Sequence, residues 1–194
     1  NEVPSQWGEG GVAELTMLQD LVKNLDGIRP VTCGMDQIGS VLDNGFAASL
    51  DIPSFNYKPQ YYEEIYAKMP QKMLIGSESA STVSSRGVYH FPVSFEKEHN
   101  EVLHADHQSS SYDNETCSWS NTPDIDFMMD EKPWVLGQFV WTGFDYLGEP
   151  SPYDTDAWPN HSSLFGIIDL ASLPKDRFYL YRSQWNTHSP TLHI

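Results

Sequence analysis

Short apolar segments alternate with helix-like segments along this chain, and this alternation restricts its fold more than any other feature. The apolar runs predict strands at residues 29–33, 48–52, 72–76 and 134–141. Apolar residues at helical spacing, with glycine or proline near the boundaries, predict helices at residues 12–25, 36–44, 60–69, 123–130 and 176–185. Strands that alternate with helices indicate an α/β fold, with a parallel sheet covered on both faces.

The residues that end or follow the predicted strands distinguish between two α/β architectures. Tyr57, Glu78 and Trp141 stand at such positions, and in a (β/α)8 barrel this edge of the sheet carries the active site. A doubly wound sheet would share the alternation, but no glycine-rich phosphate fingerprint follows any of the strands. The pattern therefore favours a TIM barrel. Residues 79–121 are polar and weakly periodic, which predicts a long functional or mobile loop.

The charge of the chain excludes several classes of partner. Asp and Glu number 27 against 11 Lys and Arg, a net charge of −16, and such a surface repels nucleic-acid phosphates and anionic membranes. No apolar run approaches the ~20 residues of a membrane-spanning helix, so we expect neither nucleic-acid binding nor membrane insertion. Two cysteines are too few for a disulfide framework, so they do not indicate whether the protein resides in an oxidising or a reducing compartment.

Glu2 and Glu78 are the residues best suited to catalysis. Both stand at inferred strand ends among small or polar neighbours. Two carboxylates that face each other across a barrel mouth suit glycoside hydrolysis, in which one is held protonated and the other is ionised. A separation of ~5–5.5 Å would indicate a retaining mechanism, but sequence spacing does not give this distance. The alternative is that both are ordinary surface glutamates, which are numerous in this chain.

Four segments resemble one family of glycosidases, in the family's own order. Asn1-Glu2 is similar to the Asn-Glu pair that ends the fourth barrel strand in clan A, and residues 75–78 are similar to the nucleophile strand of glycoside hydrolase family 2. Residues 137–150 resemble the eighth-strand segment of that family's β-galactosidases, and residues 165–185 resemble the end of their catalytic barrel. The resemblance implies that residues 1–194 are the C-terminal half of a TIM-barrel catalytic domain, about strands five to eight with their helices, in a larger multidomain enzyme.

The resemblance also implies roles for individual residues. Glu2 corresponds to the general acid/base, Glu78 to the nucleophile, and Asn1 to the partner of the sugar 2-hydroxyl. Tyr57 corresponds to the tyrosine that orients the nucleophile. Trp141 corresponds to the aromatic floor under a sugar ring, although by position alone it could equally be a core residue.

Two carboxylates and one tripeptide bear on the choice of sugar. Asp145 and Glu149 could hydrogen-bond sugar hydroxyls, or they could cap turns of their loop. The β-glucuronidases of the family carry an Asn-x-Lys motif near the segment that aligns with Ser163-Leu164-Phe165, and this tripeptide has neither an amide nor an ammonium group. We therefore expect a neutral sugar.

The activity that the resemblance implies is that of a retaining exo-β-galactosidase, which acts on oligosaccharide or polysaccharide β-galactosides and needs no cofactor or metal. One alternative is a carbohydrate-binding or structural half-barrel without turnover, and another is a different neutral-sugar enzyme such as a β-mannosidase. We expect the half-barrel alone to be inactive, and to aggregate or to pair with the missing half or a second copy. The resemblance favours a periplasmic or extracellular location.

Three other groups of residues carry weaker signals. His99, His104, Asp106 and His107 do not match a zinc-binding pattern, and a solvated loop is the better interpretation. Cys33 is expected to be a core thiol. Cys117 lies in the polar segment without an evident base, which argues against a nucleophilic cysteine.

Overall fold

The computed structural model describes the whole chain except residues 92–107, 112–115, 117–118, 149–161 and 194. Two compact units make up the chain. The first consists of Asn1–Ser79 and Met128–Phe139, and the second consists of Ala80–Phe127 and Val140–Ile194.

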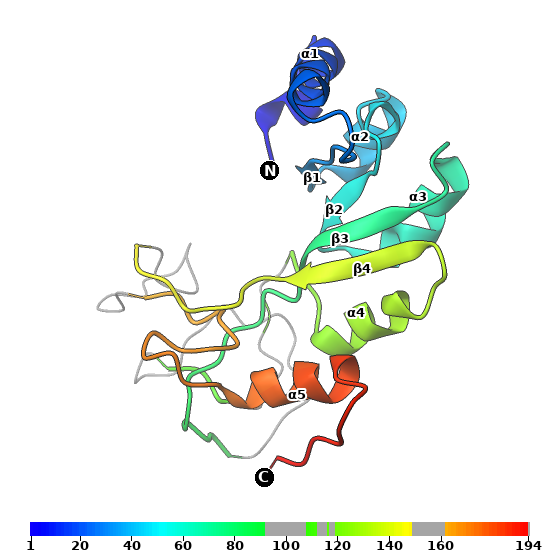
Figure 1. Cartoon of the computed structure of the whole chain (residues 1–194). Coiled ribbons are helices and arrows are strands. Elements are labelled where there is room, and N and C mark those ends of the chain that lie inside the picture. Colours follow the sequence, from blue (N-terminus) through cyan, green and yellow to red (C-terminus); the bar gives the residue numbers. More distant parts are fainter. Residues whose placement is uncertain (92–107, 112–115, 117–118, 149–161, 194) are drawn as a thin grey trace. The chain divides into compact units, whose positions relative to one another are not determined.

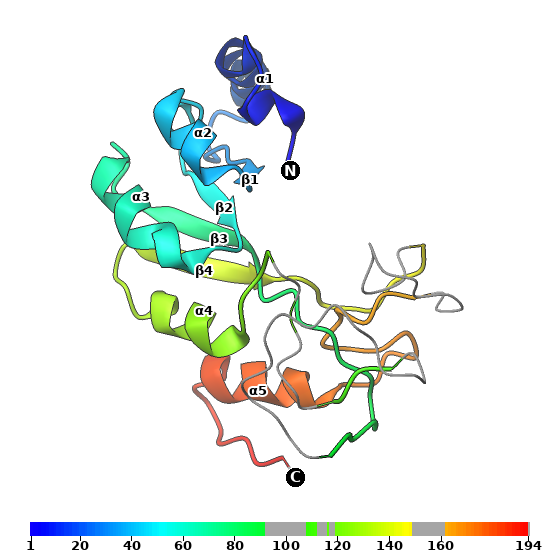
Figure 2. The same ribbon diagram turned by 180° about the vertical axis from the view of Figure 1, so that it is seen from behind.

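The first unit is built on a sheet of four strands in the order β1-β2-β3-β4. These are β1 (Gly34–Met35), β2 (Ser54–Asn56), β3 (Leu74–Ser79) and β4 (Val135–Val140). β1 pairs with β2 and β2 pairs with β3, in both cases in parallel. β4 lies beside β3 and runs in the same direction (Figure 1 and Figure 2). The predicted α/β fold with a parallel sheet is confirmed.

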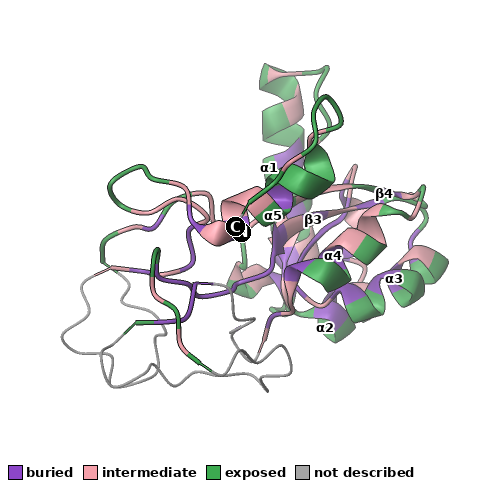
Figure 3. Cartoon of the chain, turned by 90° about the horizontal axis from the view of Figure 1, so that it is seen from below, coloured by how far each residue is buried: buried purple, intermediate pink, exposed green. Residues whose placement is uncertain are grey.

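Helices precede or connect the strands of this unit. They are α1 (Gly11–Leu25), α2 (Ile38–Asp43) and α3 (Tyr62–Lys68), together with the 3-10 turns η1 (Pro4–Gln6), η2 (Ala47–Ser49) and η3 (Pro59–Tyr61). The helix α4 (Pro123–Asp130) begins in the second unit and ends in the first. In α2 and α3 the buried and exposed positions fall on different sides (Figure 3). No helix of the described residues is both long and apolar enough to cross a membrane.

The core of the first unit joins these helices to the strands. Buried apolar side chains from α1, α2, α3 and all four strands form one cluster: Leu15, Met35, Ile38, Val41, Phe55, Tyr62, Ile65, Leu74 and Val135, with neighbouring residues from the connections. Burying side chains of this size contributes about 1.5–3 kcal/mol each. This cluster therefore holds the strands in place, and with them the residues at their carboxyl ends.

Two of the predicted strands are wrong. Residues 29–33 contain Pro30, which has no backbone N–H to donate, and the N–H of Val31 bonds to the Asp51 carboxylate at 2.9 Å instead of to a strand. Residues 48–52 overlap η2, where Ser49 donates through both its N–H and its hydroxyl to the Gly45 carbonyl. The strands start later, at Gly34 and at Ser54.

The predicted cover on both faces of the sheet also fails along β4. Leu136 and Phe139 are 53% and 67% exposed, because β4 is the last strand in the order and the described residues add no strand beyond it. The other two strands and all five helices agree with prediction to within three residues at each boundary.

The second unit contains α5 (Asp176–Trp185) and long irregular connections. Isolated bridges such as Thr82 with Thr116 and Phe144 with Ile168 join these connections. Val83 and Phe165 form a small buried cluster, against which half-buried residues such as Trp141 pack. Within its described part, the segment 80–121 has no regular strand or helix, as its composition predicts.

Candidate active site

An irregularity between β2 and β3 sets the position of Glu78. Ser54 pairs with Ile75 and Phe55 with Gly76, but Asn56 pairs with Glu78, so Ser77 is an extra residue in β3. Such a bulge turns the side chains that follow it. The hydroxyl of Ser77 donates to the side-chain carbonyl of Asn56 at 2.6 Å, which stabilises the irregular register. Asn56 and Glu78 are therefore neighbours at the carboxyl ends of adjacent parallel strands.

Each oxygen of the Glu78 carboxylate accepts a short hydrogen bond. Asn1 donates from Nδ2 to Oε1 at 2.7 Å, and the hydroxyl of Tyr57 donates to Oε2 at 2.6 Å. The backbone N–H of Tyr57 also donates to the Glu78 carbonyl at 2.6 Å. Because Glu78 and Tyr57 are only 9% and 6% exposed, the carboxylate has a defined orientation with little access to water.

Asn56 connects this carboxylate to Glu2. Its Nδ2 donates to Asn1 Oδ1 at 3.0 Å and to Glu2 Oε1 at 2.8 Å, which uses both hydrogens of the amide. The backbone N–H of Glu2 donates to the carbonyl of Gly34 in β1 at 2.9 Å. The two glutamates thus belong to one hydrogen-bonded network, in which Glu78 is buried and Glu2 is exposed.

Gly34 lies under this network and leaves room for it. A Cβ atom at this position would lie 2.3 Å from Asn1 Oδ1 and 2.8 Å from Asn56 Oδ1. Any side chain larger than hydrogen would therefore displace the two amides that hold the glutamates.

Burial raises the pKa of the Glu78 carboxyl above its ordinary value, and the negative charge of Glu2 acts in the same direction. The hydrogen bonds from Tyr57 and Asn1 oppose this rise, because they stabilise the charged form. A carboxylate that is desolvated but oriented by two donors is chemically suited to act as a nucleophile or a base.

Known proteins that resemble this chain support a glycosidase. The β-galactosidase BoGH2A of Bacteroides ovatus is 37% identical over 205 residues, which cover the whole of this chain and 23% of that protein. A protein of Formosa agariphila, whose name points to a β-glucuronidase, is 41% identical over 86 residues, which cover 44% of this chain and 8% of that protein. No protein-family model matches the chain.

Solved structures show the same fold. A family 2 glycosyl hydrolase of Bacteroides cellulosilyticus matches with a TM-score of 0.66 and 24% identity, over 96% of this chain and 20% of its own length. A β-glucuronidase of Bacteroides uniformis matches with a TM-score of 0.69 and 18% identity, over 96% of this chain and 21% of its own length. The chain belongs to glycoside hydrolase family 2. It spans less than a quarter of the length of each of these relatives.

In this family 2 chain, four of the predicted site residues lie together in the first unit: Asn1, Glu2, Tyr57 and Glu78. Trp141 and Asp145 belong to the second unit. Glu149 lies outside the described residues, as do Cys117 and the segment from His99 to His107. Their predicted roles stay predictions.

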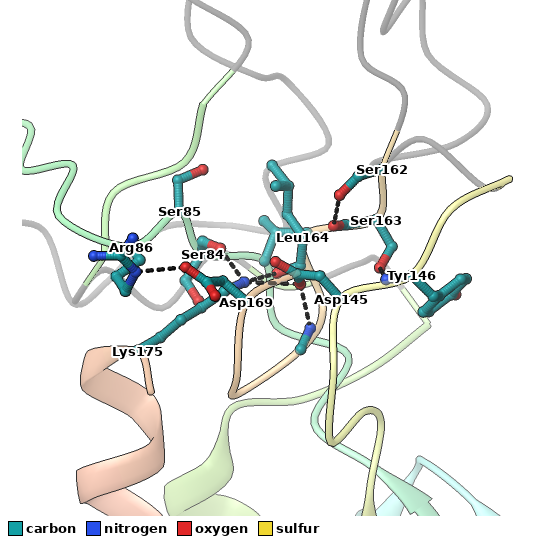
Figure 4. A network of polar contacts seen from close by, with 12 residues as sticks. Ser84, Ser85, Arg86, Asp145, Tyr146, Ser162, Ser163, Leu164, Asp169 and Lys175 are labelled. Carbon is teal, nitrogen blue, oxygen red and sulfur yellow. Dashed lines mark hydrogen bonds and ion pairs between the residues drawn. The ribbon is translucent and has the colours of Figure 1, made fainter. Parts of the chain in front are cut away.

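A buried ion pair dominates the surroundings of Asp145 in the second unit (Figure 4). Lys175 Nζ lies 2.8 Å from Asp145 Oδ1 and also donates to the carbonyls of Ser84 at 2.6 Å and Leu164 at 3.3 Å. The N–H of Gly166 donates to the same Asp145 oxygen at 2.8 Å. Burial raises the pKa of the Asp145 carboxyl, and the Lys175 ammonium opposes this rise. Asp145 therefore has a structural role, whether or not it also binds sugar.

Trp141 is half-buried, and its ring meets that of Tyr146 edge-to-face, with centroids 5.9 Å apart. Cys33 is half-buried and packs against the core of the first unit, as expected of a small apolar thiol. Among the described residues, no group of three or more His, Cys, Asp or Glu side chains could hold a metal ion.

Sequence reasoning missed Asn56 and Ser77, which connect the two glutamates. A detectable signal existed for Asn56, because it directly precedes Tyr57, which the sequence already singled out. The role of Ser77 depends on the register between β2 and β3, which has no local sequence signature.

Proposed function

We propose that this chain is the C-terminal half of a TIM-barrel catalytic domain in a longer enzyme, and that the enzyme is a retaining exo-β-galactosidase. The observation that carries the proposal is the Glu78 carboxylate, held by Tyr57 and Asn1 in one network with Glu2. Two carboxylates joined through one network supply the pair of groups that glycoside hydrolysis requires. The name of the Bacteroides ovatus relative favours galactose.

The proposed reaction has two steps. In the first, Glu2 donates its proton to the glycosidic oxygen as the bond from C1 to this oxygen breaks, and a Glu78 oxygen forms an ester bond to C1. In the second, Glu2 removes a proton from water, the water oxygen bonds to C1, and the ester bond to Glu78 breaks. Two displacements at C1 leave the anomeric configuration unchanged.

The hydrogen bonds around Glu78 fit this sequence. Tyr57 and Asn1 each hold one carboxylate oxygen, so the attacking group is oriented before substrate arrives. Asn56 donates to Glu2 and to Asn1, and Asn1 donates to Glu78, so one chain of hydrogen bonds connects the proton donor with the nucleophile. When Glu78 becomes an ester, its negative charge disappears, and the repulsion between the two carboxylates disappears with it.

We expect a neutral sugar because Ser163-Leu164-Phe165 offers no cation to a sugar carboxylate, and Ser163 is buried. A β-mannosidase is a second neutral-sugar candidate. The names of the Formosa agariphila relative and the Bacteroides uniformis structure make a β-glucuronide the natural comparison substrate.

A second candidate function is sugar binding or structural support without turnover. Binding alone, however, does not require a buried carboxylate held by two donors beside a second, exposed glutamate.

The deciding experiment uses the complete protein that contains this chain. Aryl β-galactoside hydrolysis is compared between the natural protein, its Glu78→Gln variant and a Glu9→Gln control, since Glu9 is an exposed glutamate in the same unit. We expect Glu78→Gln to lower kcat by orders of magnitude and Glu9→Gln to have no effect. Aryl β-mannosides and β-glucuronides test the sugar. Full activity of Glu78→Gln would exclude Glu78 as the nucleophile.

A further inference from the structure

A buried glutamine outside the proposed catalytic residues joins two loops beside them. Gln6, in η1, is fully buried. Its Nε2 donates to Asp36 Oδ1 at 2.6 Å, and its Oε1 accepts from the backbone N–H groups of Asp36 and Gln37 at 3.1 and 3.2 Å. The side chain of Asn44 donates to the Gln6 carbonyl at 2.9 Å. Gln6 therefore ties the segment that follows Glu2 to the connection between β1 and α2.

The same connection is tied to the segment that carries Tyr57. Lys58 Nζ donates to the Asp36 carbonyl at 2.7 Å. Tyr57 and Lys58 have φ angles of 58° and 56°, in the left-handed region that costs about 1–2 kcal/mol for residues with a Cβ atom. Such a conformation persists where surrounding contacts impose it. Asp36 thus hydrogen-bonds to Gln6 through its carboxylate and its backbone N–H, and to Lys58, the neighbour of Tyr57, through its backbone carbonyl.

Glu2 is closely connected to Gln6 through the backbone. Three residues separate them, among them Pro4, and the N–H of Gln6 bonds to the Val3 carbonyl at 3.1 Å. A shift of Gln6 therefore moves Glu2, whose side chain is exposed. Misplacement of a catalytic group by ~1 Å can lower a rate by about 100-fold.

We propose that Gln6 is a positioning residue, which sets the place of the Glu2 carboxyl relative to Glu78 through its amide contacts with Asp36. This inference rests on the proposed function. It assigns to Gln6 a larger effect on the proton-donation step than on the nucleophile.

Reversal of one hydrogen bond tests the proposal with little change of shape. In Gln6→Glu, the new carboxylate keeps acceptors for the two backbone N–H groups, but it cannot donate to Asp36 and repels that carboxylate. In Asp36→Asn, the amide oxygen still accepts from Gln6, so this variant is the matched control. The double variant Gln6→Glu with Asp36→Asn restores a hydrogen bond in the opposite direction.

The activity test uses the complete protein and two leaving groups. Dinitrophenolate departs without protonation, whereas phenolate benefits from a proton donor. We expect Gln6→Glu to lower kcat/KM for phenyl β-galactoside about 10- to 100-fold, and for dinitrophenyl β-galactoside by less than about threefold. The double variant should recover the phenyl galactoside rate to within about threefold of the natural protein, and thermal unfolding should show all variants folded.

The outcomes separate this inference from the proposed function. Equal losses on both substrates, no loss, or a loss that the double variant does not recover would overturn the role of Gln6 while leaving the glycosidase proposal standing. A natural protein that cleaves no aryl glycoside would overturn the proposed function itself, and the role of Gln6 with it.

Discussion

The hydroxyl of Tyr57 acts directly on the ionisation of the Glu78 carboxyl, and Tyr57→Phe removes only that hydroxyl. The hydroxyl donates to Glu78 Oε2 at 2.6 Å. Both side chains are buried, so the lost bond is not readily replaced by water. We expect the pKa of Glu78 to rise further above its ordinary value, because this bond is among those that lower it.

The size of the effect follows from the strength of a hydrogen bond to a charged group, about 1.5–3 kcal/mol. On the acidic side of the pH profile, the rate is proportional to the ionised fraction of the nucleophile. A loss of this free energy therefore lowers the acidic-side rate about 10- to 150-fold relative to the plateau.

The assay is the pH dependence of kcat/KM for an aryl β-galactoside with the complete protein. Tyr57→Phe should move the acidic limb to higher pH. Tyr61→Phe is the matched control, because Tyr61 is 41% exposed and lies close by in η3, and it should leave the limb in place. An unchanged acidic limb in Tyr57→Phe would refute the assignment of that limb to Glu78.

Three further predictions concern stability and packing. Burial raises the folded-state pKa of Glu78, so the folded protein loses stability as pH rises from the ordinary carboxyl range through this raised pKa. Glu78→Gln removes this loss and should raise Tm more at pH 7 than at pH 4. An equal gain in Tm at both pH values would contradict this prediction. Gly34→Ala should displace Asn1, whose Oδ1 would lie 2.3 Å from the new Cβ, and aryl galactoside kcat should fall at least about tenfold. Lys175→Met should lower the free energy of unfolding by about 3–5 kcal/mol, because it leaves Asp145 buried without its cation. Denaturant unfolding measures this change, and an unchanged free energy of unfolding would contradict the structural role of the ion pair.

The sequence predicted the helices well, because their apolar spacing is set by the helix itself. Residues 123–130 and 176–185 match α4 and α5 at both ends. The strands were harder to locate, since β1 and β2 contain only two and three residues and the neighbouring apolar residues lie in irregular connections or in η2. Pro30 and Pro53 lie in these connections, and their missing N–H groups were a usable signal.

The glutamates of the candidate site could be identified through a family resemblance, but their connection could not. Asn56 and Ser77 act through a strand register that tertiary pairing determines. The buried partner of Asp145 was equally hidden, because Lys175 is 30 residues away in sequence. Long-range polar contacts of this kind have no periodicity from which to predict them.

The nucleophilic role of Glu78 is the central claim, and trapping of the covalent intermediate tests it most directly. A 2-deoxy-2-fluoro-β-galactosyl fluoride should glycosylate the nucleophile with loss of fluoride from C1, and the resulting glycosyl-enzyme should hydrolyse slowly, because the fluorine at C2 destabilises the charge that develops at C1. Mass spectrometry of the digested complete protein should find one fluorogalactosyl group on the peptide that contains Glu78. A label on a different carboxylate, or no label in a protein that hydrolyses aryl galactosides with inversion, would contradict the account.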